Sequence, residues 1–162
     1  MTLEALLKLR EGCRNDVYLD SLKKPTVGIG HLVTSADHLK VGDHIDDARV
    51  SALFKKDSAA ALSAAKAQAS KAGIKDSDFI VYLASVNFQL GTSWYTKFPK
   101  TWALIMKGEY KEAAKEAGKS TWNSQTPVRV KDFQQALLKL PEKAPASTAS
   151  KGAAAGAGKG TK

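Results

Sequence analysis

The first apolar positions of the chain recur with the spacing of an α-helix. Leu6 and Leu7 fall on one helical face, Thr2 precedes them as a suitable N-cap, and Gly12 follows as a natural stop. This pattern predicts a helix that ends at Glu11. The carboxyl group of Glu11 is therefore expected at the end of an apolar helix.

The pattern then changes from helical spacing to that of short strands. Between Asn15 and Ile29, β-branched and aromatic residues flank the sequence Ser-Leu-Lys-Lys-Pro at 21–25, which predicts a β-hairpin. From His31 to Ile45 the sequence is polar and contains Asp and Gly residues, so we expect a loop with room for one more short strand.

Helical spacing returns in the second third of the chain. A long helix is predicted from Asp46 to Gly73. The next helix is predicted to be capped by Asp76, Ser77 or Asp78 and to end at Gly91. From Ile80 onward it is almost wholly apolar, which marks it as the central buried helix. The other predicted helices are residues 99–108, residues 110–118 and a last helix that starts at Pro127. In the last helix Val130, Phe133 and Leu137 are expected to form the stripe that faces the core.

Together these elements predict an α+β fold that is mainly helical. It has a small N-terminal β-hairpin lobe at about 13–45, a long connecting helix, and a C-terminal helical lobe made of the first helix with residues 72–140. The domain is expected to span residues 1–140. After Leu140 the composition shifts to Pro, Ala, Gly, Ser and Lys, which predicts a disordered tail over residues 141–162.

Composition adds a basic surface to this picture. The chain has 162 residues, of which 43% are hydrophobic, and its formal net charge is +9. That length and balance let a single domain bury its own core. The positive excess attracts nucleic acid, an anionic membrane or an anionic cell wall alike, or simply keeps the protein dissolved. Charge alone does not choose among these roles.

The N-terminus and the cysteine content limit the location and the chemistry. Glu4, Lys8 and Arg10 interrupt the N-terminal leucines, unlike in a secretion signal, and no apolar run approaches the ~20 residues needed to cross a bilayer. Cys13 is the single cysteine, which excludes an internal disulfide and a cysteine-rich metal site. We therefore expect a cytoplasmic protein without signal peptide, transmembrane segment, metal or cofactor.

Two carboxyl groups near the predicted hairpin suit the cleavage of a glycosidic bond. That reaction needs one carboxylic acid that protonates the departing oxygen, and an ionised carboxylate that positions water or stabilises the cationic sugar. Desolvation at a helix end can keep Glu11 protonated, whereas Asp20, beside a turn, stays hydrated and ionised. A hairpin register that differs by a residue or two would give the second role to Asp16.

The motif around these carboxyl groups resembles the phage-type lysozymes, a family of glycoside hydrolases. The spacing from Glu11 through Asp20 and Thr26 to His31 agrees with the catalytic region of that family. Together with later segments, the resemblance covers roughly residues 1–138, and several ordered matches are more specific than one short motif. The later segments are Leu53-Phe54-Lys-Lys-Asp57, Asn87-Phe88-Gln89-Leu90-Gly91 and Trp122-Asn-Ser-Gln125-Thr126-Pro127-Val-Arg129.

This resemblance implies a lysozyme-like fold and an activity. The expected reaction is hydrolysis of the β-1,4 bond between N-acetylmuramic acid and N-acetylglucosamine in bacterial peptidoglycan. Glu11 would be the general acid, while Asp20 and Thr26 would hold the attacking water on the opposite face of the sugar, so that the anomeric carbon is inverted. Taken by itself, Thr26 is equally an ordinary strand residue.

The resemblance also implies roles for residues around the catalytic group. Expected substrate-binding residues are Leu32, Phe88 and Thr101, and expected supporting residues are His31, Gln89 at the lobe junction, and Arg129 as the ion-pair partner of the catalytic acid. Each has a simpler interpretation, since the two apolar residues also suit a core, the histidine a structural hydrogen bond and the arginine a surface ion pair.

The sequence departs from the family pattern in two places. The segment between His31 and Leu53 is shorter than in the T-even phage members, so the small lobe is expected to be trimmed. Glu116 stands where those members have an asparagine, and no substrate contact is assigned to it.

The implied biological setting is lysis of a bacterial host. The enzyme would remain in the host cytoplasm until a holin-type membrane pore releases it, and then act as a monomer on periplasmic or extracellular murein. Two other functions compete with this one. A lytic transglycosylase breaks the same bond with a single acid/base carboxylate, and the pair of Asp20 and Thr26 argues against it. A basic nucleic-acid-binding protein fits the charge, but no helix-turn-helix or aromatic-basic RNA motif is present, so we expect no nucleic acid partner.

Overall fold

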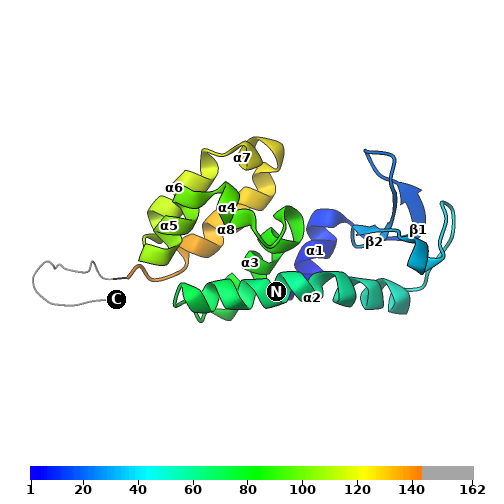
Figure 1. Ribbon diagram of the computed structural model, residues 1–162, viewed down its shortest axis with the longest axis horizontal. Coiled ribbons are helices and arrows are strands. Elements are labelled where there is room, and N and C mark those ends of the chain that lie inside the picture. Colours follow the sequence, from blue (N-terminus) through cyan, green and yellow to red (C-terminus); the bar gives the residue numbers. More distant parts are fainter. Residues whose placement is uncertain (144–162) are drawn as a thin grey trace, which may run out of the picture. The chain divides into compact units, whose positions relative to one another are not determined.

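The computed structural model describes residues 1–143, which contain eight α-helices and a three-stranded antiparallel sheet (Figure 1). This composition confirms the predicted α+β fold with mainly helical content. The described residues divide into two compact units. Unit 1 consists of residues 1–70 and 74–97, and unit 2 consists of residues 71–73 and 98–143.

The first helix of unit 1, α1 (Leu3–Glu11), has the predicted bounds. At its start, the Thr2 hydroxyl oxygen accepts a hydrogen bond from the backbone N–H of Ala5 at 3.1 Å, which satisfies one of the free N–H groups of the first turn. At its end, Gly12 adopts a φ of 81°, a left-handed conformation that glycine reaches without strain. Both ends are therefore set by residues that lie beside them in the sequence.

The predicted hairpin follows α1 and gains a third strand. The sheet has the order β1-β2-β3, and all of its pairings are antiparallel. Thr26 in the central strand pairs with Tyr18 on one side and with Leu32 on the other. The strands are β1 (Arg14–Leu19), β2 (Pro25–Gly28) and β3 (His31–Leu32).

The remainder of unit 1 is helical. A short 3-10 helix η1 (Ser35–Asp37) precedes α2 (Asp47–Lys71), α3 (Ser77–Leu90) and α4 (Trp94–Lys97). α1 packs against α3, and both helices belong to unit 1. One core cluster contains Leu7, Val17, Val27, Ile29, Ile45, Val50 and Phe54.

Unit 2 is a small helical assembly. α6 packs against both α5 and α8, and α7 packs against α6 and α8. The apolar stripe predicted for the last helix is confirmed, because Val130, Phe133 and Leu137 are all buried. The helices are α5 (Pro99–Lys107), α6 (Tyr110–Gly118), α7 (Thr121–Gln125) and α8 (Pro127–Leu138).

Two short helices, α4 and α7, were not predicted from the sequence. Each spans little more than one turn, which is too short for apolar residues to recur with a helical period. Each buries one tryptophan, Trp94 in α4 and Trp122 in α7. Packing of these large side chains, rather than helical propensity, holds the two segments in place.

Ordered contacts continue past Leu140 into the segment expected to be a disordered tail. The Glu142 carboxylate accepts the backbone N–H of Lys111 at 2.9 Å, and the Lys143 ammonium donates to the carbonyl of Ala72 at 2.7 Å. These contacts extend unit 2 as far as residue 143. The rest of the predicted tail, residues 144–162, lies outside the described part of the chain.

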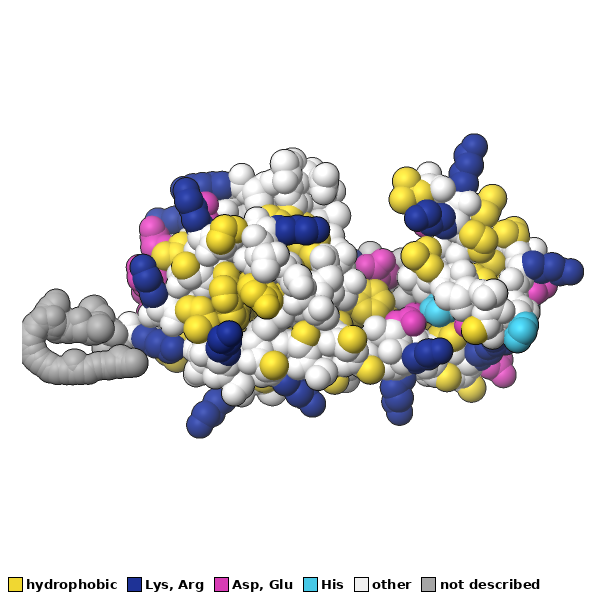
Figure 2. All heavy atoms as spheres, viewed as in Figure 1, with side chains coloured by type: hydrophobic (Ala, Val, Ile, Leu, Met, Phe, Trp, Pro, Cys, Tyr) yellow, Lys and Arg dark blue, Asp and Glu magenta, His cyan; other side chains and the backbone are white. Residues whose placement is uncertain are grey.

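The surface carries charge over both units. On the face shown in Figure 2, the Lys and Arg side chains of the described residues are scattered and do not gather into one broad basic patch. None of the helices described for this chain has the length and apolar character that membrane crossing requires.

Candidate active site

The carboxyl group of Glu11 lies against the turn that joins β2 to β3. A Cβ atom built on Gly30 would stand 3.0 Å from Glu11 Oε1 and 3.5 Å from its Cδ. Gly30 also has a φ of 64°, so this position combines a left-handed backbone with a close approach of the glutamate. Glu11 itself is half-buried at the last position of α1. The end of the helix thus delivers the carboxyl group to the edge of the sheet, as the sequence predicted.

Asp20 is placed by the turn of the hairpin. Its Oδ1 atom accepts the backbone N–H groups of Leu22 and Lys24, each at 2.8 Å, and its own N–H donates to the Lys24 carbonyl at 2.9 Å. Within residues 1–143, the second oxygen Oδ2 accepts no hydrogen bond, so one face of a half-buried carboxylate stays available.

The strand register relates Asp20 to Thr26. Tyr18 is paired with Thr26, and side chains two residues apart along a strand point to the same face of a sheet. The backbone N–H of Asp20 donates to the Lys24 carbonyl, so the ladder of hydrogen bonds continues one residue beyond Leu19. Asp20 therefore points to the same face as Tyr18 and lies diagonally across from Thr26. The Thr26 hydroxyl donates to the Lys24 carbonyl at 3.0 Å, which leaves its oxygen lone pairs as acceptors.

Asp16, the competing candidate for the second carboxylate, has another partner. Its Oδ1 atom lies 2.7 Å from Nδ1 of His44, and the two residues also form an isolated backbone bridge. Both side chains are exposed, at 65% and 69%. Asp16 therefore links the first strand to the loop that precedes α2, and this geometry favours Asp20 for the role beside Thr26.

A pocket of about 380 Å³ opens beside these elements in unit 1. Gly30, which contacts Glu11, is one of its lining residues. Leu32 and Phe88, both expected to contact substrate, line it as well, and Leu32 is 51% exposed although it is apolar. An exposed apolar side chain at a pocket wall suits contact with the faces of a sugar ring. The pocket also includes His31, Asp57 and Asn87.

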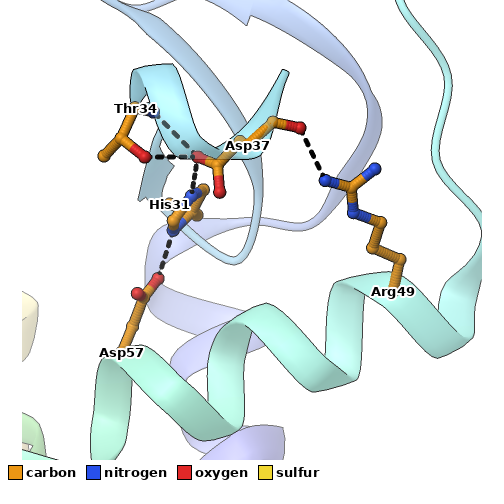
Figure 3. A network of polar contacts seen from close by, with 5 residues as sticks. All are labelled: His31, Thr34, Asp37, Arg49 and Asp57. Carbon is orange, nitrogen blue, oxygen red and sulfur yellow. Dashed lines mark hydrogen bonds and ion pairs between the residues drawn. The ribbon is translucent and has the colours of Figure 1, made fainter. Parts of the chain in front are cut away.

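His31 is buried between two carboxylates from different elements (Figure 3). Its Nδ1 lies 2.6 Å from Oδ2 of Asp57 in α2, and its Nε2 lies 2.7 Å from Oδ2 of Asp37 in η1. The same Asp37 oxygen accepts the backbone N–H of Thr34 at 2.7 Å, while Arg49 donates to the Asp37 carbonyl. The network therefore joins β3, η1 and α2 at the pocket wall.

The two carboxylates determine the charge of this histidine. Burial by itself lowers the pKa of His31, but the hydrogen bonds and negative charges of Asp37 and Asp57 outweigh it and raise the pKa above 6.5. Burial likewise raises the pKa of Asp37, and the hydrogen bonds from Thr34 and His31 outweigh that effect and lower it below 3.8. Because a carboxylate engages each ring nitrogen, His31 is held in place on both sides of its ring. This arrangement suits a positioning group rather than one that acts on substrate.

A buried amide network behind the pocket was not predicted from the sequence. Gln68 in α2 and Asn87 in α3 exchange two hydrogen bonds, at 3.0 and 2.9 Å. Gln68 Nε2 also donates to the Thr92 carbonyl, and its Oε1 accepts from the Trp94 indole at 3.1 Å. Asn87 and Thr92 both line the pocket, so the network holds one of its walls. Gln68 finds these partners in segments far along the chain, whereas Asn87 also donates to the Leu83 carbonyl of its own helix at 2.9 Å. Nothing local in the sequence signals the contacts between the two amides.

Of the nine expected site residues, Leu32, Phe88 and His31 line this pocket, and the other six are not among its lining residues. These six are Glu11, Asp20, Thr26, Gln89, Thr101 and Arg129. Gln89 is half-buried in α3 and does not line the pocket. Thr101 is buried in α5, and Arg129 is half-buried in α8, so both belong to unit 2. Within residues 1–143, no cluster of His, Cys, Asp and Glu side chains is arranged to hold a metal ion.

Comparison with known proteins places this geometry in context. The family model described as phage lysozyme matches residues 8–136. The chain is also similar to two proteins of Dictyostelium discoideum, probable T4-type lysozymes 1 and 2. Each is 31% identical over 150 residues, and each alignment covers 79% of this chain and 88% of the relative.

Proposed function

The chain belongs to the phage lysozyme family and is accordingly a glycoside hydrolase of the lysozyme type, and from this premise we propose how it cleaves its substrate. The proposed substrate is the β-1,4 bond between N-acetylmuramic acid and N-acetylglucosamine in bacterial peptidoglycan. Glu11 is the general acid in this mechanism, and Asp20 with Thr26 binds the attacking water.

The observation that carries the proposal is the contact between Glu11 and Gly30. It brings a half-buried carboxyl group from the end of an apolar helix to a residue that lines the pocket. In the proposed complex a sugar ring packs on Leu32 and Phe88, and its glycosidic oxygen is directed toward Glu11, which approaches the lining residue Gly30. Transfer of the Glu11 proton to that oxygen releases the leaving sugar as an alcohol and leaves a carboxylate.

Asp20 and Thr26 supply the second half of the reaction. The Oδ2 atom of Asp20 and the Thr26 oxygen are both acceptors on the same face of the sheet. A water that donates its two hydrogens to these acceptors directs a lone pair outward, toward the anomeric carbon. Asp20 takes the proton that this water loses. Attack from the side opposite the leaving group inverts the anomeric centre.

A lytic transglycosylase would break the same bond without water. In that reaction a hydroxyl of the muramic acid itself attacks, so a dedicated water-binding pair has no role. The two reactions differ in their products, because hydrolysis leaves a free reducing muramic acid and the transglycosylase leaves an anhydro end. Analysis of the reducing ends after digestion of purified murein decides between them.

We also propose that the enzyme serves lysis of a bacterial host and reaches the murein through a holin-type pore. Membership of the phage lysozyme family supports this setting. Expression in a bacterial host with and without a holin tests it, since lysis is expected only when both proteins are present. Lysis by the enzyme alone would show that it needs no such pore.

The catalytic proposal is tested on purified murein in a zymogram with Glu11→Gln. Loss of the general acid is expected to reduce clearing by on the order of 100-fold or more, because positioned acid catalysis contributes at least that much. Glu4→Gln is the matched control, because Glu4 lies in the same helix but pairs with Lys8 at an exposed position. Full activity of Glu11→Gln would overturn the assignment.

A further inference from the structure

Arg14 lies three residues after the proposed general acid, at the start of β1, and has no part in the reaction described above. Its guanidinium carbon lies 4.1 Å from the centre of the Tyr18 ring, over the face of that ring. Such a cation–π contact restrains the long arginine side chain, while the N–H groups at the edge of the guanidinium can still donate. Arg14 is exposed, so these donors are open to a ligand.

A bulge in β1 brings the arginine to the tyrosine. Arg14 is paired with Gly28 and Tyr18 with Thr26, so residues 15–17 of β1 stand opposite a single residue of β2. Four residues of a regular strand span about 13 Å, whereas partners that are two residues apart in β2 are separated by only about 7 Å. The bulge therefore shortens the distance along the sheet and lets the arginine side chain reach the tyrosine ring.

The bulged residues are held by the loop that precedes α2. The Asn15 carbonyl accepts the backbone N–H of Ile45 at 2.7 Å, and the backbone N–H of Val17 donates to the Asp43 carbonyl at 2.8 Å. The Asn15 side chain also donates to the Ile45 carbonyl at 2.9 Å. The bulge is thus a hydrogen-bonded part of the fold rather than a frayed strand end, and it fixes the backbone from which Arg14 projects.

The stacked arginine lies beside the residues assigned to the attacking water. Tyr18 is paired directly with Thr26, and the side chains of such a pair lie on the same face of the sheet with their Cβ atoms about 5 Å apart. Asp20 points to this face as well. A guanidinium stacked on Tyr18 therefore stands next to the sugar that the water attacks in the proposed reaction.

Within residues 1–143, no acidic side chain pairs with this cation. Arg14 takes part in no ion pair and donates no side-chain hydrogen bond there. Asp16, two residues along the strand, is paired with His44 at 2.7 Å, and Oδ1 of Asp20 accepts two backbone N–H groups of the hairpin turn. The planar edge of a free guanidinium is suited to a carboxylate, to which it donates two parallel hydrogen bonds.

We infer that Arg14 binds the lactyl group of N-acetylmuramic acid, an inference that rests on the proposed function. This ether substituent ends in a carboxyl group, and it distinguishes N-acetylmuramic acid from N-acetylglucosamine. The group is a carboxylate in glycan strands without peptide and an amide where a peptide is attached, and a guanidinium donates to the oxygens of both. Contact with the lactyl group places the muramic acid ring over the water-binding pair. Arg14 thus selects which of the two alternating β-1,4 bonds is cleaved.

The test is binding of the disaccharide N-acetylglucosaminyl-β-1,4-N-acetylmuramic acid, followed by NMR titration. This compound lacks the bond that the enzyme is proposed to cut, so binding is measured without turnover. The comparison ligands are its methyl ester and N,N′-diacetylchitobiose, which has no lactyl group. The wild type is expected to bind the acidic disaccharide about fivefold more tightly than diacetylchitobiose, the size of one exposed charged contact, with the ester in between.

Three variants separate recognition of the lactyl group from a structural role. Arg14→Gln is expected to lose the fivefold preference, whereas a merely structural change would alter the affinity for all three ligands alike. Lys23→Gln is the matched control, because it removes the same charge from an exposed residue of the same hairpin and should keep the preference. Arg14→Lys keeps the charge without the planar pair of donors, and should keep only part of the preference.

Three outcomes would overturn the inference. They are a wild type without preference for the acidic disaccharide, a preference that survives in Arg14→Gln, and an equal loss of preference in Lys23→Gln. Because this assay measures binding alone, its failure leaves the Glu11→Gln zymogram informative. A wild type that shows the Arg14-dependent preference but does not clear murein would contradict the proposed function and leave the binding site in place.

Discussion

Glu11 Oε1 lies 3.0 Å from the position that a Cβ atom of residue 30 would occupy. The carboxyl group therefore packs closely against Gly30, and a Cβ atom at residue 30 requires the glutamate to give way by a few tenths of an ångström. This close approach makes a glycine in the turn between β2 and β3 part of the placement of the acid.

Gly30→Ala is expected to lower murein hydrolysis severalfold, because the new methyl group shifts the Glu11 carboxyl group by a few tenths of an ångström and catalysis is sensitive to the position of the acid. It should also cost about 1 kcal/mol of stability, because alanine is strained at a positive φ. The control is Gly42→Ala, which also has a positive φ of 95° but has open space around its Cβ position. If both variants lose activity equally, the contact with Glu11 is not what matters.

Asp20→Asn is expected to lose on the order of 100-fold in activity, because an amide cannot take the proton of the attacking water. Asp16→Asn should retain near-normal activity, since Asp16 is paired with His44 at an exposed site. Rates on purified murein, measured for both proteins alongside thermal unfolding, check this. A larger loss for Asp16→Asn would return the second catalytic role to that residue.

The environment of His31 predicts how stability depends on pH. The raised pKa means that the contribution of His31 to folding is complete below pH 6.5 and is lost as the pH rises through the raised value. The lowered pKa of Asp37 means that its contribution is complete above pH 3.8 and is lost as the pH falls through the lowered value. Both contributions to stability are therefore fully present between pH 3.8 and pH 6.5.

His31→Asn should therefore cost most stability near pH 5, by about 3 kcal/mol as for other broken buried pairs, and progressively less in alkaline solution. Urea unfolding across pH 4 to 10 measures this difference. His44→Asn serves as the comparison, because its exposed pair with Asp16 is worth only about 0–1 kcal/mol. A cost for His31→Asn that does not change with pH would show that the ring is uncharged in the folded protein.

The buried amide network should behave as a unit. Asn87→Leu removes one of the two partners of each hydrogen-bonding group of Gln68, leaving Thr92 and Trp94, and is expected to destabilise the protein by about 1–2 kcal/mol. The double variant Gln68→Leu/Asn87→Leu should cost less than the sum of the two single variants. Chemical unfolding of the wild type, the two single variants and the double variant gives the coupling energy between Gln68 and Asn87. If the two single losses of stability simply add up in the double variant, the two side chains do not act together.

Truncation separates the end of unit 2 from the residues that follow it. A chain that stops after Leu140 loses the contacts of Glu142 with Lys111 and of Lys143 with Ala72, and should unfold about 1–2 kcal/mol more easily than a chain that stops after Lys143. Thermal unfolding of the two truncated proteins compares them directly. Equal stability would mean that these contacts are not maintained in solution.

Much of the secondary structure was determined by residues that act on their immediate neighbours. Thr2 and Gly12 bound α1, and the Asp76 side chain caps α3 by accepting the N–H of Phe79. The Thr-Ser-Ala-Asp sequence that ends at Asp37 even carries the pattern of a capping box, a local signal for η1 that the sequence interpretation passed over. Caps and turns are readable because their partners lie within four residues.

The sequence by itself therefore determined the order of the elements, the placement of Glu11 at a helix end and, through family resemblance, the candidate catalytic residues. Only the tertiary structure decided that Asp57 and Asp37 share His31 and that Gln68 meets Asn87 and Trp94. The reason is that polar groups buried far apart in the chain are stable only when folding brings their partners to them. No local pattern encodes which partner that is.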